Sequence, residues 1–454
     1  MKIKATFIPL LGAWVWAHGM VAVASQAVAC PSHVPASARC YAADTPAGAH
    51  VMAILPASWQ ASSGVAVMHA HGGPGLGKAS IKRVEEDAAR WAIMPSSGYA
   101  WAGTSYRRGG YGVAVAAEDM KDLQQWFVAQ FGQPRRMVLH GQSYGGGVAS
   151  VAAERYGSQP EGKSGRPVFD AVLLTSSVLG GGVDAYTMRL DLRAVYQFYC
   201  RNHPLPSEPQ YPLWQGLPAD STLDRAELER RVHDCTGNNK PAAERTPAQA
   251  QRLAAILAAV PVTDKSLIGH LTWGTFLFRD VTQKRLGNRN PFDNSRTHYQ
   301  GLDATSEAVL NQGVLRYTAD PQAVGQLLAD SRPTGRTTLP TLTIRGIHDP
   351  TAFVELAQSY QQIREAAGTA AHLMQVYTGE RGHSYLSDPE YRAVMAALLD
   401  WVDKGEQPTP QSVAERCAAE AGKPPVAKGS NTGCHIELAY QPAALETRVP
   451  GPRP

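Results

Sequence analysis

The feature that most constrains this chain is an apolar stretch that ends abruptly at a serine between glycines. Residues 137–139 form an apolar run typical of a buried strand, and the motif Gly-Gln-Ser-Tyr-Gly follows at 141–145. Small and apolar residues continue through 148–153, as in a buried helix. A strand, a sharp turn and a helix in this order predict a nucleophile elbow, although an ordinary glycine-rich turn has the same local pattern. The rest of the chain must therefore decide between the two interpretations.

Apolar runs and amphipathic segments alternate along much of the chain. Strands are expected at 50–55, 64–70, 98–105, 137–140, 171–176, 340–344 and 373–377. Helices are expected between most of these runs. This alternation predicts an α/β fold with a mostly parallel sheet that helices cover on both faces.

The alternation lapses in the middle of the chain, and this interruption suggests a division into segments. We expect a signal peptide at 1–29, a first core part at 30–178, a helical insertion at 179–339, a second core part at 340–404 and a disulfide-stapled C-terminal tail at 405–454. An insertion at this point would cover the edge of the sheet that holds the serine, so we interpret it as a lid. An independent second domain is the alternative.

The first residues have the layout of an export signal. A basic start with Lys2 and Lys4 precedes an apolar centre, and Ala-Val-Ala at 27–29 fits a cleavage site. The mature protein should therefore be secreted or periplasmic. An uncleaved membrane anchor is one alternative, although His18 interrupts the apolar run, and a lipoprotein attached through Cys30 is another.

Charge and cysteine content further narrow the classes of protein to which the chain can belong. The formal net charge is +4, and the signal peptide supplies part of it, so no nucleic-acid partner and no membrane integration are indicated. An even number of cysteines, six, in an exported chain favours disulfides. Proximity suggests the pairs Cys30–Cys40, Cys200–Cys235 and Cys417–Cys434, with other pairings left open. No Cys-x-x-Cys spacing points to zinc or redox chemistry.

A second glycine motif, His-Gly-Gly-Pro-Gly at 71–75, follows the strand expected at 64–70. Glycines after a strand expose backbone N–H groups, which are the donors of an oxyanion hole. We therefore expect the N–H groups of Gly73 and Tyr144 to serve as such donors, while a plain tight turn is the alternative. His69 and His71 are two residues apart, but no cysteine or carboxylate cluster accompanies them, so neither a metal nor another cofactor is expected.

A serine hydroxyl needs a base, and the base needs an orienting carboxylate. Asp349 and His383 each follow an expected strand, in the chain order that this topology requires. His348 adjoins the candidate acid, His372 precedes a strand and His140 lies inside one, so His383 is the preferred base. The alternative role of Asp349 is to cap the following helix. Tyr106 and Gln142, close to the two glycine motifs, are candidate substrate contacts.

Together these motifs resemble the α/β-hydrolase superfamily over residues 50–180 and 336–404. The loop at 71–75 is similar to that of prolyl aminopeptidases, and Leu-Pro-Ala-Ser-Trp at 55–59, Gly-Thr-Ser-Tyr at 103–106, Asn-Pro-Phe-Asp-Asn at 290–294 and Pro-Thr-Gly at 333–335 resemble secreted bacterial hydrolases with large lids, among them phthalyl-amidase-like enzymes. The resemblance implies a serine hydrolase that forms an acyl-enzyme on a small-molecule or peptide acyl substrate. Gln142 and Tyr144 stand where small prolyl aminopeptidases usually have glycine and tryptophan.

Three hypotheses for the function follow. The first is an exported ester or amide hydrolase that uses Ser143, His383 and Asp349. The second is an exopeptidase of the prolyl or tripeptidyl aminopeptidase type, which would need a carboxylate in the insertion, such as Glu227, Glu229 or Asp280, to bind a free amino terminus. The third is an inactive binding protein on a hydrolase scaffold, since a fold does not by itself specify a function.

Overall fold

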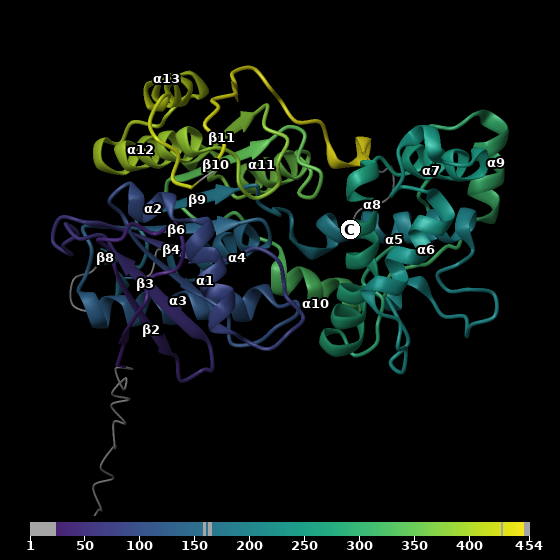
Figure 1. Cartoon of the computed structure of the whole chain (residues 1–454), viewed down its shortest axis with the longest axis horizontal. Coiled ribbons are helices and arrows are strands. Elements are labelled where there is room, and N and C mark those ends of the chain that lie inside the picture. The colour runs from purple at the N-terminus through teal and green to yellow at the C-terminus, as the bar shows by residue number, and fades with distance from the viewer. Residues whose placement is uncertain (1–23, 158–159, 162–165, 428–429, 449–454) are drawn as a thin grey trace, which may run out of the picture.

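A ten-stranded sheet forms the centre of the computed structural model, which describes residues 24–157, 160–161, 166–427 and 430–448 (Figure 1). The strand order is β1-β2-β3-β5-β4-β6-β9-β10-β11-β12. The strands are β1 (Gln26–Val28), β2 (Arg39–Asp44), β3 (His50–Leu55), β4 (Val65–Ala70), β5 (Ala100–Thr104), β6 (Arg136–Gln142), β9 (Ala171–Thr175), β10 (Thr341–Gly346), β11 (Leu373–Thr378) and β12 (Ile436–Glu437). A separate hairpin pairs β7 (Pro160–Glu161) with β8 (Arg166–Pro167).

The direction of the strands divides the sheet into a parallel centre and antiparallel margins. Strands β5, β4, β6, β9, β10 and β11 are parallel, while β1, β2 and β3 pair in antiparallel fashion at one margin and β12 at the other. The carboxyl ends of the parallel strands meet at one edge, where loops collect functional groups. With the elbow on its central strand, this topology is the predicted α/β-hydrolase fold.

Helices cover both faces of the sheet. The helices of the core are α1 (Ile81–Arg90), α2 (Ile93–Ser96), α3 (Val113–Phe131), α4 (Tyr144–Ala152), α11 (Leu356–Ala366), α12 (Asp388–Lys404) and α13 (Pro410–Glu420). Alternate residues of β4 point to opposite faces of the sheet. Met68 belongs to the hydrophobic cluster that includes residues of α3 and α4, whereas Val67 belongs to the cluster that includes residues of α1 and α12. Burial on both faces explains why the central strands are continuous apolar runs.

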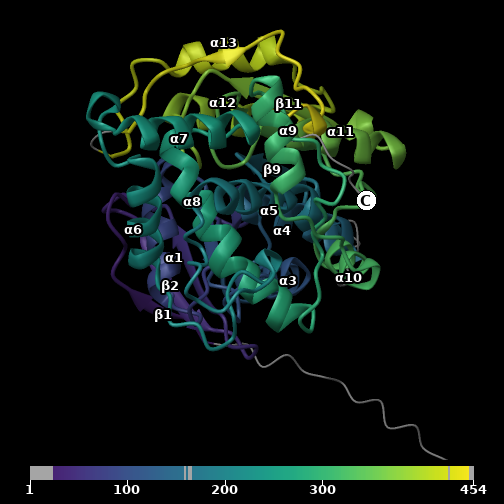
Figure 2. The same ribbon diagram turned by 90° about the vertical axis from the view of Figure 1, so that its right-hand side faces the viewer.

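Between β9 and β10 the chain forms helices and no strand. These helices are α5 (Gly181–Cys200), α6 (Arg225–Thr236), α7 (Pro247–Ala259), α8 (Leu267–Thr272), α9 (Ala304–Gly313) and α10 (Pro321–Ser331), with π-helical turns at Trp273–Leu277 and Asp280–Arg285. Most of them gather beside the sheet (Figure 1) and stand in front of it in the turned view (Figure 2). We call residues 179–339 the helical segment, and its function as a lid stays a prediction.

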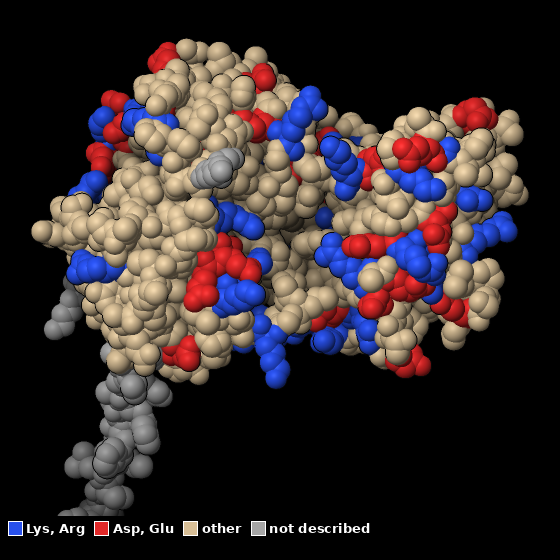
Figure 3. Space-filling model, in the orientation of Figure 1, with Lys and Arg blue, Asp and Glu red and all other residues tan. Residues whose placement is uncertain are grey.

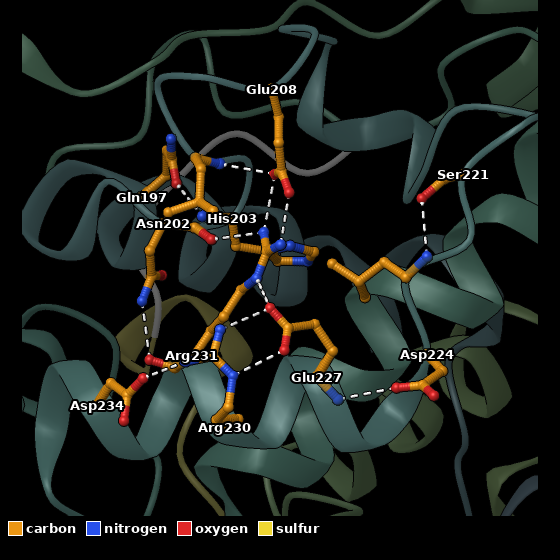
Figure 4. A network of polar contacts seen from close by, with 12 residues as sticks. Gln197, Asn202, His203, Glu208, Ser221, Asp224, Glu227, Arg230, Arg231 and Asp234 are labelled. Atoms are coloured by element: carbon orange, nitrogen blue, oxygen red, sulfur yellow. Dashed lines mark hydrogen bonds and ion pairs between the residues drawn. The ribbon is translucent and has the colours of Figure 1, made fainter.

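An ion-pair network stabilises one part of the helical segment (Figure 4). Arg231 on α6 lies 2.5 Å from Glu208 and 2.7 Å from Glu227, and it also donates to the carbonyl of Asn202. Arg230 donates to Glu227 as well. These contacts tie α6 to the loop that follows α5, and the bond Cys200–Cys235 joins the end of α5 itself to α6.

The cysteines form the three pairs that proximity suggests. The disulfides are Cys30–Cys40, Cys200–Cys235 and Cys417–Cys434. The last one links α13 to the segment before β12, and β12 pairs with β11. The residues after 405 therefore contribute a helix and an edge strand to the core, which is more order than an extended tail would have.

Most of the predicted signal peptide lies outside the described residues. The part that is described includes β1, which pairs with β2, so cleavage after Ala29 would remove this edge strand. Export therefore stays a prediction, to which the three disulfides are suited. Within the described ranges, no single helix has the length and apolarity to cross a membrane, and one bent pair, Pro247–Ala259 with Asp264–Arg285, passes by length and composition.

Candidate active site

The elbow at Ser143 has the strained geometry that its glycines predict. Ser143 lies between the end of β6 and the start of α4 with φ of 55° and ψ of −122°. A Cβ at position 141 would lie 2.4 Å from the carbonyl oxygen of Gly145, and one at position 145 would lie 2.0 Å from that of Ala70. Both positions therefore require glycine, because the helix starts in direct contact with the neighbouring strand.

Backbone hydrogen bonds hold the strained serine in place. Its N–H donates to Thr175 at 3.1 Å, and its carbonyl accepts from Gly146 at 2.9 Å and from Val178 at 2.8 Å. Ser143 is largely buried, with 7% of its surface exposed. Such over-determined surroundings allow an unfavourable φ to persist.

Three side chains that are distant in sequence meet at this edge of the sheet. The Nε2 atom of His383 lies 2.9 Å from Oγ of Ser143. Its Nδ1 atom lies 2.8 and 2.9 Å from the two carboxylate oxygens of Asp349. The carboxylate is inaccessible to solvent, whereas the His383 side chain is 19% exposed. The arrangement is an unbroken hydrogen-bonded chain from carboxylate to imidazole to hydroxyl.

Asp349 does not cap the following helix, which was its alternative interpretation, because α11 begins at Leu356 and its N-cap residue is Glu355. One carboxylate oxygen accepts from the N–H groups of Thr351 at 2.8 Å and Ala352 at 2.9 Å. These bonds fix the carboxylate in the loop after β10. The backbone contacts and the His383 contact coexist, so the carboxylate can orient the imidazole while it holds its own loop.

The competing histidines lie elsewhere. His140 is fully buried, with Nδ1 3.0 Å from Nδ1 of His69 and Nε2 3.1 Å from the hydroxyl of Thr175. His372 lies in the turn before β11, and His348 lines a cavity. In the part of the chain that the structure describes, no group of three or more His, Cys, Asp or Glu side chains is arranged to hold a metal ion.

The two predicted oxyanion donors lie at the start of α4 and on the loop after β4. Tyr144 is the first residue of α4, where an N–H group has no partner within the helix. Gly73 has φ of 73°, and its loop contacts the start of α4, because a Cβ at position 145 would lie 2.6 Å from the carbonyl oxygen of His71. Arg83 donates to the carbonyl of Gly72 and so orients this loop. Both N–H groups are thus held at the edge that carries Ser143.

The two candidate substrate contacts have partners within the protein. Tyr106 is buried, stacks on the ring of His71 at 4.0 Å and directs its hydroxyl to the His71 carbonyl at 3.3 Å. Gln142 donates to the hydroxyl of Ser384 at 2.7 Å, which joins the strand before the serine to the loop of His383. A contact of either residue with substrate stays a prediction.

Arg345, a fully buried residue of β10, supports the acid loop and was not among the predicted site residues. Its guanidinium donates to the carbonyls of Ser177 at 2.8 Å and Phe353 at 3.1 Å, and burial lowers its pKa. The contacts join the loop of Asp349 to the loop that follows β9, beside the elbow. A charged residue within an apolar strand was the available signal, because a buried charge needs strong partners.

The carboxylates considered for an amino-terminus site all pair with arginine. Glu227 pairs with Arg230 and Arg231 (Figure 4), and Glu229 pairs with Arg225 at 2.8 Å. Asp280 lies 3.2 Å from an Arg285 nitrogen and also accepts from the N–H of Tyr111. Each of these carboxylates therefore already has a cationic partner.

Burial of several histidines predicts that acid destabilises the fold. Desolvation lowers the pKa of His71 to about 4 and those of His140 and His270 to about 3. They stay neutral in the fold, whereas the unfolded chain binds protons below pH of about 6.5, so each costs about 2 kcal/mol of stability at pH 5. Burial raises the pKa values of Asp87 and Glu390 to about 6, which stabilises the fold as pH falls between about 6 and 4.

The histidine contribution is the larger one, because burial also lowers the pKa values of His69 and His203, so the free energy of unfolding should fall by an amount on the order of several kcal/mol from pH 7 to pH 5. Urea unfolding at the two pH values measures this change. A free energy of unfolding that is equal or higher at pH 5 would contradict the prediction.

Comparisons with known proteins return structural likeness alone. No protein-family model and no curated protein matches the chain. Solved structures that resemble it include an esterase from Aspergillus oryzae, with 12% identity, a TM-score of 0.43 and coverage of 84% of this chain and 85% of the other. Another is Candida antarctica lipase A in its closed state, with 11% identity, a TM-score of 0.43 and coverage of 91% and 94%. At such identities the likeness concerns the fold, and the activity has to be argued from the site.

Proposed function

We propose that the protein is an exported serine hydrolase that cleaves a carboxylic ester or amide through an acyl-enzyme intermediate. The observation that supports this proposal is the hydrogen-bonded chain from Asp349 through His383 to Ser143, with all its distances between 2.8 and 2.9 Å. Positions of this kind allow an imidazole to take a proton from an otherwise unreactive hydroxyl. The strained elbow supports it further, because it presents the hydroxyl above the edge of the sheet.

In the proposed mechanism, the Ser143 oxygen attacks the acyl carbon while its proton passes to Nε2 of His383. Asp349 orients the imidazole and stabilises its positive charge. The N–H groups of Gly73 and Tyr144 stabilise the negative charge that develops on the carbonyl oxygen. The imidazolium then gives its proton to the leaving alcohol or amine. In the second half of the reaction, water attacks the acyl-enzyme while His383 takes its proton. His383 then returns this proton to the Ser143 oxygen as the carboxylic acid leaves.

An alkyl fluorophosphonate tests the proposal directly. The mature protein should react at Ser143, and mass spectrometry of the digested protein should find the adduct on the peptide that contains this residue. The label should be absent after denaturation, since an isolated serine hydroxyl is unreactive. If the folded protein neither labels nor hydrolyses any p-nitrophenyl ester or anilide, the inactive-scaffold hypothesis is favoured instead.

Blocking the amino group of a substrate distinguishes the hydrolase hypothesis from the exopeptidase hypothesis. An exopeptidase requires a free amino group, so it prefers an amino-acid p-nitroanilide over its N-acetylated form. We expect no such preference, because the carboxylates Glu227, Glu229 and Asp280 are already paired with arginines. A strong preference for the free amine would favour the exopeptidase.

A further inference from the structure

A cavity of about 820 Å³ lies between the helical segment and the loop after β10. Its walls include His270 and Trp273 from the helical segment and residues 347–351 from the core, so it reaches Asp349. Figure 3 shows a hollow between these two parts of the molecule, with basic and acidic side chains around it. The volume is within the range of small-molecule binding sites, which span about 300 to 1,000 Å³.

One buried cation lines this cavity without an ionic partner. Arg189 of α5 is 3% exposed, and the structure describes no ion pair for it within the residues that it covers. Its Nη1 atom donates to the carbonyl of Ala185 at 2.7 Å, while Nε is buried without a hydrogen-bond partner in the described chain. The guanidinium carbon lies 5.0 Å from the ring centre of Tyr186 and 5.1 Å from that of Trp273.

Arg189 carries its positive charge at neutral pH. Desolvation lowers its pKa to about 10, which is still well above 7. A buried charge of this kind is costly unless hydrogen bonds and an opposite charge accompany it. The described surroundings supply one carbonyl and two aromatic faces, so among these residues the site lacks the anion that a buried guanidinium usually has.

The other charges of the wall do not supply that anion. Asp349 is occupied by His383 and by two backbone N–H groups. Arg448 is neutralised by Glu355 at 2.9 Å, whereas Lys265 and Arg381 add exposed positive charge. The cavity therefore has an excess of positive charge, which attracts anionic ligands.

Contiguous aromatic rings connect Arg189 with the elbow. The ring centre of Tyr186 lies 5.6 Å from that of Tyr111, and the ring centre of Tyr111 lies 5.6 Å from that of Tyr144. Tyr144 follows Ser143 in the chain. These three rings are buried, so they join the wall of the cavity to the elbow through the core, and the cavity itself borders the triad at Asp349, whose carboxylate contacts His383.

We propose that Arg189 binds a carboxylate of the substrate that is separate from the bond being cleaved. The substrate class is then an ester or amide that carries a free carboxylate, and this assignment rests on the proposed function. Arginine suits this role because its planar fork donates two parallel hydrogen bonds to a carboxylate. The Nε–H group, which has no hydrogen-bond partner in the described chain, would donate to one carboxylate oxygen. The carboxylate would also supply the negative charge that the buried guanidinium lacks there.

Matched esters test the proposal. For p-nitrophenyl monoesters of succinate, glutarate and adipate, kcat/KM is compared with that of p-nitrophenyl alkanoates with the same number of acyl carbons. We expect at least one charged ester to be favoured about tenfold or more, mainly through KM, because a buried charge pair discriminates strongly. The ratio should collapse in Arg189→Met and recover in part in Arg189→Lys. The control Arg225→Met removes a charge from the surface of α6, where Arg225 pairs with Glu229, and should keep the ratio.

Direct binding gives a second readout that needs no turnover. Benzoate should raise the thermal midpoint of the wild-type protein and inhibit hydrolysis of a neutral ester competitively, whereas benzamide should do neither. The benzoate effect should vanish in Arg189→Met, and if that variant does not fold, the two wild-type comparisons decide. Hydrolysis without preference for the charged esters, together with no benzoate effect, overturns the proposal and leaves the proposed function intact. Absence of both labelling and hydrolysis overturns the proposed function, while the benzoate comparison still decides the role of Arg189.

Discussion

Replacing Ser143 by alanine is expected to lower kcat for a short p-nitrophenyl ester by about 10⁴- to 10⁶-fold. The hydroxyl is the group that His383 contacts at 2.9 Å, and no other atom at this position can form the acyl-enzyme. Alanine keeps the Cβ of serine, so the strain of the φ of 55° does not change and the fold should persist. Ester turnover and the thermal midpoint, measured on the same preparation, separate loss of chemistry from loss of structure.

The matched control for this variant is Ser150→Ala on α4. The Ser150 hydroxyl donates to the carbonyl of Gly146 at 2.8 Å, so it is a buried serine of the same helix without a contact to His383. Its replacement should leave turnover close to the wild-type rate. If Ser143→Ala retained turnover, or if Ser150→Ala lost it while folded, the assignment of the nucleophile would be wrong.

The second large effect is expected for Asp349→Asn, which should reduce kcat by about 10³- to 10⁴-fold. The asparagine oxygen can still accept from the N–H groups of Thr351 and Ala352, so the loop should keep its shape. Its amide nitrogen would then face Nδ1 of His383 and force this atom to accept a hydrogen bond. The imidazole proton would move to Nε2, which could no longer accept the proton of Ser143.

The rate of fluorophosphonate labelling should fall in parallel with kcat for Asp349→Asn. A suitable control is Asp320→Asn, because Asp320 caps α10 by accepting from Gln322 and Ala323, and asparagine caps a helix equally well. The control should hydrolyse ester at the wild-type rate. The double variant Ser143→Ala/Asp349→Asn should be no worse than Ser143→Ala alone, since both residues act on the same proton transfer. Independent, multiplicative losses would contradict a single hydrogen-bonded chain.

Local patterns predicted the fold and the three central side chains because these features depend on short stretches of sequence. The elbow at Ser143 needs an apolar strand, two glycines and a small-residue helix, all within 137–153. Asp349 and His383 were predicted by their position directly after strands. The cysteine pairs were also predictable, since each partner is near the other in the chain.

Contacts across the fold were not predictable in the same way. The short edge strands β1 and β12 have no apolar alternation, and they form because β2 and β11 offer unpaired backbone groups beside them. The hydrogen bond from Gln142 to Ser384 joins residues 242 positions apart, and no local pattern marks either of them. The same holds for Arg345, whose two carbonyl acceptors come from separate loops.

The sequence by itself therefore determined the sheet, the strained turn and the kinds of chemical group at the edge of the sheet. These depend on backbone propensity and hydrophobic periodicity, which act over a few residues. Tertiary structure alone decided the distances that join hydroxyl, imidazole and carboxylate, and it alone left Arg189 buried beside a cavity with no ionic partner among the residues that the structure describes. The physical reason is that hydrogen bonding, desolvation and charge compensation depend on which distant side chains become neighbours, and only packing of the helical segment against the core establishes those neighbours.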